Sequence, residues 1–320
     1  MRRRQFAALV TASAAAFAVP AALAQDKSIK ILVGFPPGGS VDTIARLLAE
    51  KLRTSLGQNV IVENKPGAGG RVALVETRRA APDGQTLVLS PSGALVLQPW
   101  LYQNLGYDPL KDFTAISRVT TFDFAITVGP SAPQGDLKAV LAWMKANPGK
   151  ANYATSGAGT IPHFAGQLLA QATGVPMTHV AYRGGAPAAQ DLVGGQVPLM
   201  IDTASETIEH HKAGKVRILA VTGDVRSKVL PDVPTLTELG INATADAYFG
   251  LYGPAGMAPD TVARIDRAVA DALRAPEVQE KITSVGLVAS YSGPAELAAT
   301  QAAHLKRWEA PIKASGFKAE

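Results

Sequence analysis

The sequence predicts an α/β protein that is long enough for two domains, and three features of the chain support this class. Residues 30–42 read as a buried strand, a Pro-Gly turn and the start of a helix, and residues 151–160 repeat that pattern. The remaining chain alternates strand and helix segments, which favours largely parallel sheets. No low-complexity linker divides the chain after residue 24, so two domains would share it discontinuously through crossing strands.

The helices of the two strand–turn–helix units are amphipathic. After each turn, apolar side chains recur at a spacing of three and four residues, which is typical of one face of a helix. They are Val41, Ile44, Ala45, Leu48 and Leu52 in the first unit, and Ile161, Ala165, Leu168, Leu169 and Ala172 in the second. Each unit therefore places a helix start just beyond the carboxyl end of a strand.

The later elements follow in chain order. We expect strands at 59–62, 86–89, 125–128, 178–181, 199–201 and 216–221. Helices are expected at 71–81, after Asp136 as N-cap, at 186–193, after Asp260 as N-cap, and at 294–314. Apolar segments at 122–128 and 247–253 are the expected hinges. They divide the chain into a first domain of residues 25–122 and 250–320 and a second domain of residues 123–249.

The N-terminus has the pattern of a secretory signal peptide. Three arginines at positions 2–4 precede an apolar run at 6–20, and Ala22-Leu23-Ala24 forms a small-residue cleavage site. The run is shorter than the roughly 20 residues that a membrane span needs, which favours cleavage after Ala24 over a retained anchor. Arg3-Arg4-Gln5-Phe6 also fits the core of a twin-arginine signal. We therefore expect export of residues 25–320, by either route.

The composition excludes several classes of protein and site. The 320 residues contain no cysteine, which excludes disulfides, thiolate metal sites and a thiol nucleophile. The formal net charge is +5, but three of those charges are the N-terminal arginines, which leaves +2 on the mature chain. No basic stretch is interleaved with aromatic residues, so we expect no nucleic-acid partner.

The tips of the two strand–turn–helix units are candidate binding sites. A helix start offers free backbone N–H groups and the positive end of the helix dipole, which together suit an anion. The candidates are Phe35, Gly38, Gly39, Ser40 and Asp42 in one tip and Thr155, Ser156, Gly157 and Thr160 in the other. A tight turn with Ser40 or Asp42 as a helix cap is the alternative, and it is compatible with binding. Two such tips suggest a clamp around a small anion.

Motifs for other chemistries are missing. The glycine-rich stretch 63–70 fits neither a phosphate loop nor a dinucleotide-binding fingerprint. No Gly-x-Ser-x-Gly elbow occurs, and the nearness of His163 to Ser156 in sequence does not make a nucleophile–base pair. We expect His163 to line the cleft or cap its helix. Adjacent His210 and His211 cannot both face one metal from a helix. Because all these motifs are missing, we expect no metal, no cofactor and no catalytic residue.

Two strand ends carry further polar candidates. Tyr182 and Arg183 follow the strand at 178–181, where Arg183 either pairs with a ligand carboxylate or lies on the surface. Asp202 follows the strand at 199–201, at a carboxyl end, where open α/β sheets place their ligands. It either accepts a hydrogen bond from a ligand hydroxyl or amine, or caps the next helix.

Seven segments, spread over essentially the whole mature chain, carry a family resemblance. They are Phe35-Pro36-Pro37-Gly38-Gly39, residues 62–70, Ala81-Pro82-Asp83-Gly84, and residues 107–113, 179–184, 191–197 and 230–235. In this order they resemble the substrate-binding proteins of tripartite tricarboxylate transporters, the Bug or TctC-type family.

The resemblance implies a periplasmic binding protein of the Venus-flytrap, type II-like class, whose two lobes close on a small carboxylate. In that family, backbone N–H groups and ordered waters from two facing loops hold the carboxylate, and the matching positions are 35–40 and 155–160. Less regular side chains contact the far end of the ligand, and the candidates are Ser90, Ser92, Arg183, Asp202 and Ser205. The implied partners are the membrane subunits of the transporter, and no cofactor is implied.

Three departures from the family pattern bear on the ligand. Arg71-Val72-Ala73 replaces a glycine-containing run, Gln85 stands where an aromatic residue is usual, and Arg183 replaces a frequent lysine. A second carboxylate on the ligand is favoured if Arg71 or Arg183 faces the cleft. The sequence otherwise leaves open whether the ligand has one or more carboxylates, an aromatic ring or an amine.

Two other functions are alternatives to transport. One is an exported enzyme acting on small carboxylates, with His163 or Asp202 as a base. The other keeps the binding and makes the closed form a signal to a membrane sensor kinase.

Overall fold

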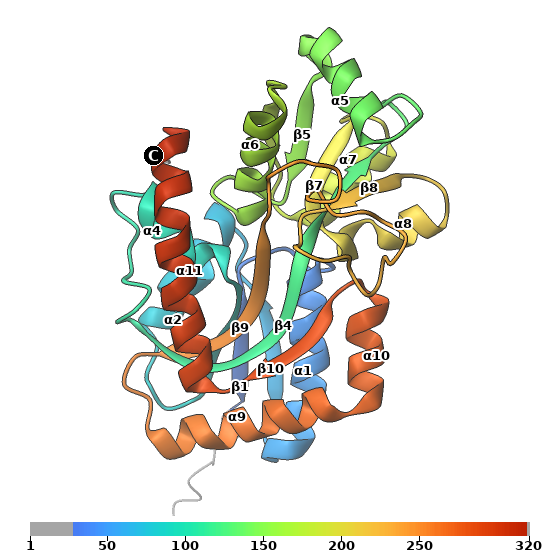
Figure 1. The fold of residues 1–320 in the computed structure, drawn as a ribbon. Coiled ribbons are helices and arrows are strands. Elements are labelled where there is room, and N and C mark those ends of the chain that lie inside the picture. The colour runs from blue at the N-terminus through green and yellow to red at the C-terminus, as the bar shows by residue number, and fades with distance from the viewer. Residues whose placement is uncertain (1–27, 319–320) are drawn as a thin grey trace, which may run out of the picture.

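The computed structural model describes residues 28–318, which form a ten-stranded sheet flanked by helices (Figure 1). The strands are β1 (Ile29–Val33), β2 (Val60–Asn64), β3 (Thr86–Pro91), β4 (Phe113–Val128), β5 (Asn152–Thr155), β6 (Thr178–Ala181), β7 (Leu199–Thr203), β8 (Arg217–Val221), β9 (Asp246–Pro254) and β10 (Val288–Ser292). The predicted signal peptide and its cleavage site lie outside the described residues.

Eleven α-helices and three short 3-10 helices (η) connect the strands in the described range. The helices are α1 (Ser40–Leu56), α2 (Arg71–Arg78), α3 (Gly93–Val96), α4 (Gln98–Leu101), α5 (Leu137–Ala146), α6 (Ile161–Thr173), α7 (Gly185–Val193), α8 (Ile208–Lys212), α9 (Pro259–Arg274), α10 (Pro276–Ser284) and α11 (Pro294–Ser315). The 3-10 helices are η1 (Ala68–Gly70), η2 (Pro148–Lys150) and η3 (Ala204–Glu206).

The long strand β4 belongs to both halves of the molecule. It pairs with β9 as far as Asp123, which lies opposite Asp246, and with β7 from Phe124, which lies opposite Thr203. The strand order is β2-β1-β3-β9-β4-β7-β5-β6, with β8 and β10 also paired to β4. The half that holds β1 lies below and the half that holds β5 lies above in Figure 1.

The expected α/β class is confirmed, but the sheet is mixed rather than largely parallel. β1 pairs in parallel with β2 and β3, and β5 pairs in parallel with β6 and β7. β4 pairs antiparallel with β7, β8, β9 and β10, and β9 also pairs antiparallel with β3. The two parallel groups therefore flank long antiparallel strands that pass between the halves.

Local sequence explains where the helices begin and end. The predicted apolar face of α1 is buried, and the helix ends at Gly57, which adopts the left-handed conformation that glycine tolerates. The Asp136 cap of α5 is confirmed, because its carboxylate accepts a 2.9 Å hydrogen bond from the N–H of Ala139. The predicted Asp260 cap is wrong: Ala258 is the N-cap of α9, and Asp260 lies inside its first turn.

The C-terminal helix α11 connects the two halves. It lies along the half that holds β1 and reaches α6 at its end (Figure 1). There the ring of Phe317 packs edge-on against His163, with 4.7 Å between ring centroids. The far C-terminus thus helps to bury the first turn of α6.

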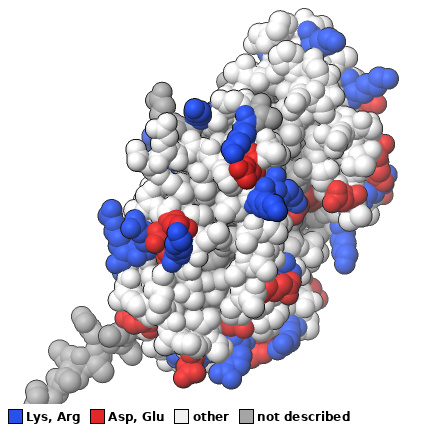
Figure 2. Space-filling model, turned by 60° about the vertical axis from the view of Figure 1, so that its left-hand side comes forward, with Lys and Arg blue, Asp and Glu red and all other residues white. Residues whose placement is uncertain are grey.

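The surface and the helices add two observations. Lys and Arg lie interspersed with Asp and Glu on the face shown in Figure 2, so this face presents no field of a single sign. Within residues 28–318, none of the helices combines the length and the apolar character needed to cross a membrane.

Replacing Gly166 in α6 by alanine should destabilise the fold, although alanine is the better helix former. A Cβ atom at Gly166 would lie 2.1 Å from Cε2 of Tyr153, whose side chain is fully buried. Overpacking a core costs about 1–3 kcal/mol, which exceeds or matches the helix-propensity gain of about 1 kcal/mol. We expect a lower melting temperature for Gly166→Ala. The exposed Gly149 has open space where its Cβ would lie, so Gly149→Ala is the control, and equal melting temperatures would contradict the prediction.

Candidate ligand-binding site

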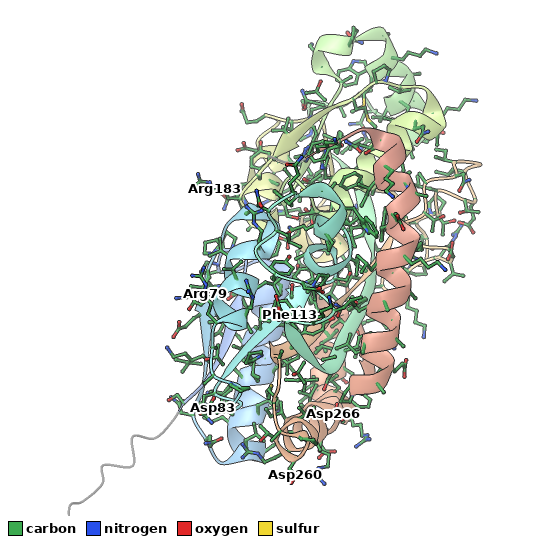
Figure 3. The ribbon with its side chains drawn as sticks, turned by 90° about the vertical axis from the view of Figure 1, so that its left-hand side faces the viewer. Arg79, Asp83, Phe113, Arg183, Asp260 and Asp266 are labelled. Carbon is green, nitrogen blue, oxygen red and sulfur yellow. The ribbon has the colours of Figure 1, made fainter. Side chains whose placement is uncertain are left out.

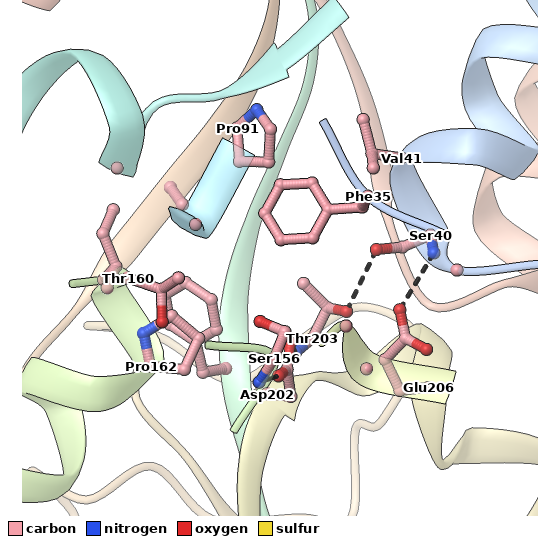
Figure 4. Close-up of a pocket in the computed structure, with 18 of the residues that line it drawn as sticks. Phe35, Ser40, Val41, Pro91, Ser156, Thr160, Pro162, Asp202, Thr203 and Glu206 are labelled. Atoms are coloured by element: carbon pink, nitrogen blue, oxygen red, sulfur yellow. Dashed lines mark hydrogen bonds between the residues drawn. The ribbon is translucent and has the colours of Figure 1, made fainter. Parts of the chain in front are cut away.

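A pocket lies where the two halves of the molecule meet (Figure 4). One wall comes from the β1–α1 turn and the segments after β2 and β3, and the other comes from the β5–α6 turn, the start of α7 and the end of β7. Phe122 and Phe124 of β4 and Phe249 of β9 form part of the lining where the strands cross between the halves. The pocket therefore draws on segments from most of the described chain.

Six of the predicted site residues line this pocket. They are Phe35, Gly39, Ser40, Ser156, Thr160 and Asp202. They come from both predicted tips and from the carboxyl end of β7, so the structure brings the two tips to one cavity. Their role in holding a ligand stays a prediction.

Three helices of at least nine residues begin at the pocket wall. The residues that open them and line the pocket are Ser40 and Val41 of α1, Ile161 and Pro162 of α6, and Gly185 and Ala186 of α7. Backbone N–H groups of a first helical turn have no partner within the helix, and the positive end of each helix dipole lies here. This arrangement favours negative charge in the pocket.

Two carboxylates of the protein itself accept backbone N–H bonds from the two tips. The N–H of Ser40 donates a 2.9 Å hydrogen bond to Oε1 of Glu206, as Figure 4 shows, and the N–H of Ser156 donates a 2.6 Å bond to Oδ2 of Asp202. Oδ1 of Asp202 accepts a 2.9 Å bond from the N–H of Thr203. Ser40 and Glu206 belong to different halves, so their hydrogen bond joins the halves across the pocket.

Burial raises the pKa of both carboxyl groups. Removal from water raises the pKa of Asp202 to about 6, although its hydrogen bonds from Ser156 and Thr203 act in the opposite direction. Burial, and then the nearby charge of Asp202, raise the pKa of Glu206 to about 7, while the hydrogen bonds from Ser40 lower it. Both carboxyl groups are therefore more readily protonated than they would be in water.

The rest of the pocket wall is largely apolar. The ring centroids of Phe122 and Phe249 are 4.6 Å apart, and those of Phe122 and Phe124 are 5.7 Å apart. Phe35 lies across the cavity from Thr160 in Figure 4. Such walls bury the apolar body of a ligand and strengthen any charged contact by excluding water.

The other ten predicted site residues lie outside the pocket lining. They are Gly38, Asp42, Ser90, Ser92, Thr155, Gly157, His163, Tyr182, Arg183 and Ser205. Several of them brace the tips from behind.

In the first tip, the carboxylate of Asp42 accepts hydrogen bonds from the N–H of Gly38 at 3.0 Å, Nε of Arg46 at 2.9 Å and Nδ2 of Asn64 at 2.8 Å. These bonds occupy Asp42 and hold the turn in place.

The second tip is braced by two stacked histidines, of which His163 is buried and His179 is half-buried. The rings of His163 and His179 stack with centroids 3.9 Å apart, and Nε2 of His179 is 2.7 Å from Oγ1 of Thr155. Burial lowers the pKa of His163 to about 4. Of the two expectations for His163, lining the cleft or capping its helix, the structure agrees with the second, because its ring lies outside the pocket lining and its Nδ1 accepts a 3.3 Å hydrogen bond from the N–H of Gly159, just before α6. The hydroxyl of Thr160 donates to the carbonyl of Gly157 at 2.7 Å and closes the turn.

The remaining hydroxyl candidates are bonded within the protein. Tyr182 donates a 2.7 Å hydrogen bond to Asp191, and Ser205 donates a 2.9 Å bond to Oγ1 of Thr203. The hydroxyl of Ser90 donates to the carbonyl of Pro91 at 3.0 Å. Ser92 accepts a 3.4 Å bond from the N–H of Tyr248. These side chains support the pocket wall from outside it.

Neither of the two candidate arginines lines the pocket. Arg183 is exposed and lies at the outer edge of the molecule (Figure 3). The guanidinium of Arg71 stacks over the ring of Tyr102, 4.2 Å from its centroid. The condition that would have favoured a second ligand carboxylate is therefore not met.

Sequence reasoning missed Glu206, Thr203 and the start of α7 as parts of the pocket. A signal was present for Glu206, because it follows the buried strand β7 by three residues and lies four residues after Asp202. Gly184 and Gly185 also line the pocket. Because they have no side chains, the backbone at the start of α7 comes close to the neighbouring pocket residues.

The two residues considered as the base of an enzyme, His163 and Asp202, lie in different places. His163 lies outside the pocket, and both oxygens of Asp202 accept backbone N–H bonds. No group of three or more His, Asp or Glu side chains arranged to hold a metal ion occurs within residues 28–318.

The fold and the pocket between its halves define a periplasmic binding protein, and comparisons with solved structures agree. The structure of the periplasmic binding protein BugD matches with a TM-score of 0.87 and 33% identity over 92% of this chain and 99% of that chain. MatC from Rhodopseudomonas palustris, with bound malate, matches with a TM-score of 0.84 and 31% identity over 89% and 98%. A second R. palustris protein, with adipate, matches with a TM-score of 0.87 and 28% identity over 91% and 98%.

Sequence comparisons place the chain within one family. The profile of the tripartite tricarboxylate transporter family receptor, TctC, matches residues 44–317. Protein BugT of Bordetella pertussis is 33% identical over 294 residues, which span 91% of this chain and 90% of BugT. The chain belongs to the TctC family, and the predicted two-lobed periplasmic-binding-protein fold is confirmed.

Lowering the pH from about 8 to about 6.5 should raise the melting temperature of the ligand-free protein. A carboxyl group whose pKa is raised by folding destabilises the fold when charged, and this penalty disappears as the pH falls through the folded-state pKa. For Glu206 that value is about 7, and for Asp202 and Asp123 it is about 6. The lowered pKa values of His163 and His179 oppose this trend only below about pH 6.5, where histidines of the unfolded chain become charged.

The Glu206→Gln variant should lose most of this rise, because glutamine keeps an oxygen for the Ser40 N–H but does not titrate. Glu209→Gln is the matched control, since Glu209 is exposed three residues further on. Thermal melts of the three proteins across the pH range check the prediction, and an unchanged slope in Glu206→Gln would refute it.

Proposed function

We propose that the protein is a periplasmic solute-binding protein that captures a small carboxylate and delivers it to the membrane subunits of a tripartite tricarboxylate-type transporter. The observation that carries this proposal is the pocket, because three helix starts line it within the fold of a transporter receptor family. The malate and adipate in the two R. palustris structures support a carboxylate ligand, since both are carboxylates.

The proposed location follows from the family and from the N-terminal sequence. BugD, which shares the fold, is a periplasmic binding protein. Residues 1–24 are proposed to act as a signal peptide that is removed after Ala24, on the Sec or the twin-arginine route.

The proposed mechanism is closure of two domains, residues 25–122 with 250–320 and residues 123–249, about β4 and β9. β4 changes its partner between Asp123 and Phe124, next to the phenylalanines of the pocket. Opening at this level would separate the N–H of Ser40 from Glu206 and expose all three helix starts. A ligand that contacts both halves then favours the closed state by its differential affinity.

Magnitudes indicate which contacts supply the affinity. Micromolar binding corresponds to about 8 kcal/mol, whereas one helix dipole contributes about 0.3–1 kcal/mol at an exposed site. Charge-assisted hydrogen bonds contribute about 1.5–3 kcal/mol each. Several backbone N–H bonds in a closed pocket, together with burial of the ligand body against phenylalanine rings, are therefore required.

The Gly39→Phe variant should lose carboxylate binding by more than about 100-fold and keep its fold. Gly39 has an extended backbone (φ −78°) that any residue adopts, and a Cβ there would lie 3.6 Å from Oε1 of Glu206, so a phenyl ring would fill the pocket. Calorimetric titration of small carboxylates, each paired with its neutral amide, measures the loss.

Gly293→Phe is the matched control, because Gly293 is the N-cap of α11 with φ −76° and lies outside the pocket lining. It should bind like the unaltered protein. Recovery of the ligand unchanged separates a receptor from an enzyme. Binding of the amides but not of the acids would overturn the proposed function.

A further inference from the structure

The charges that line the pocket do not match a ligand with several carboxylates. Asp202 and Glu206 are the acidic residues of the lining, and the described residues place no Lys, Arg or His in it. Asp202 is 5% exposed and Glu206 is partly buried. A dicarboxylate would therefore enter a water-poor cavity that already holds two acidic groups and offers no cationic side chain.

Glu206 is held firmly in the pocket wall. Its Oε1 accepts the 2.9 Å hydrogen bond from Ser40 on the opposite half. Its carboxyl group also packs against the first residue of α7, because a Cβ on Gly185 would lie 2.4 Å from Cδ and 2.7 Å from Oε2 of Glu206. The absent side chain of Gly185 makes the space for this carboxylate. No hydrogen bond to Oε2 is formed by the described residues.

The other acidic residues on the surrounding elements differ from Glu206, because they are hydrogen-bonded or ion-paired within the protein or lie outside the pocket. Asp202, at the end of β7, accepts two backbone N–H bonds. On α1, Asp42 pairs with Arg46, and on α7, Asp191 accepts a hydrogen bond from Tyr182. On α8, which also carries His210 and His211, Glu209 pairs with Lys212. Asp123 lies on β4, outside the pocket lining. Glu206 is thus the pocket acid with an oxygen left for a donor.

We propose that Glu206, with Asp202 beside it, binds a protonated nitrogen of the ligand, so that the receptor selects a small amino carboxylate with an apolar body over di- and tricarboxylates. This inference rests on the proposed carboxylate-binding function. Glu206 takes the N–H of Ser40, which leaves the starts of α6 and α7 for the ligand carboxylate, and the phenylalanines enclose its body.

Electrostatics supports this assignment. Burial and mutual repulsion already raise the pKa of Glu206, so its charged form gains most from a cation at short distance. A charge-assisted N–H···O bond to a buried carboxylate is stronger than a neutral one. The competing possibility is that a proton on Glu206 neutralises the site and a plain carboxylate binds together with it.

Matched ligand pairs that differ only in the amine test the proposal. Suitable pairs are leucine and 4-methylpentanoate, phenylalanine and 3-phenylpropanoate, 4-aminobutyrate and butyrate, and glutamate and glutarate. Calorimetric titration of the mature protein at about pH 7.5 should show at least tenfold tighter binding of the amine-bearing member in the best-binding pair. Glu206→Gln should reduce that preference at least tenfold, because it removes the charge that binds the amine and that disfavours a plain carboxylate. Glu209→Gln should keep the full preference.

The pH dependence separates the two ways of neutralising Glu206. Affinity for the amino carboxylate should fall as the pH is lowered from about 7.5 to about 6, because protonation of Glu206 removes the partner of the amine. Equal or tighter binding of the des-amino acids, with affinity rising at low pH, would overturn the inference and leave the proposed function intact. If neither member of any pair binds, the proposed carboxylate function itself fails.

Discussion

The backbone pairing of β4 is the constraint on which the rest of the structure depends. One strand of sixteen residues hydrogen-bonds to β9 in one half and to β7 in the other, so the two halves are joined through a continuous strand. The crossover brings Phe122, Phe124 and Phe249 together as the shared part of the pocket wall. It also sets the start of α1 opposite the end of β7, where Ser40 meets Glu206.

The electrostatics of the pocket follow from that placement. Three helix starts give it a wall of backbone donors, and donors of this kind favour any anion without distinguishing one from another. Glu206 and Asp202 reverse this preference locally, because each occupies an N–H group of a tip with a charge of the protein's own. A wall for a carboxylate and a position for a cation then lie in one cavity, lined by aromatic rings that raise the strength of both.

The parts of the fold and site that the sequence predicted are those fixed by local pattern. The apolar spacing of α1 and the Asp136 cap each determine structure in residues that are close by in sequence. Both tips of the pocket likewise follow from short strand–turn–helix segments. The parts that it missed depend on contacts between distant segments. Glu206 is 166 residues from Ser40, and its place in the pocket depends on Gly185 having no side chain. The sequence left open whether His163 lines the cleft or caps its helix, and the contacts with His179 and Phe317 that place it outside the pocket come from distant segments.

Recognition and closure are coupled in this arrangement. Glu206 belongs to one half, and its hydrogen-bond donor Ser40 belongs to the other, so the carboxylate is fixed in position only when the halves meet. An unneutralised Glu206 opposes closure, because closure removes its charge from water next to Asp202. A group on the ligand that neutralises Glu206 relieves this penalty in the closed state and not in the open one. A ligand needs such a difference in affinity between the open and closed states to shift the equilibrium between them. Glu206 therefore both selects the ligand and controls closure of the two halves.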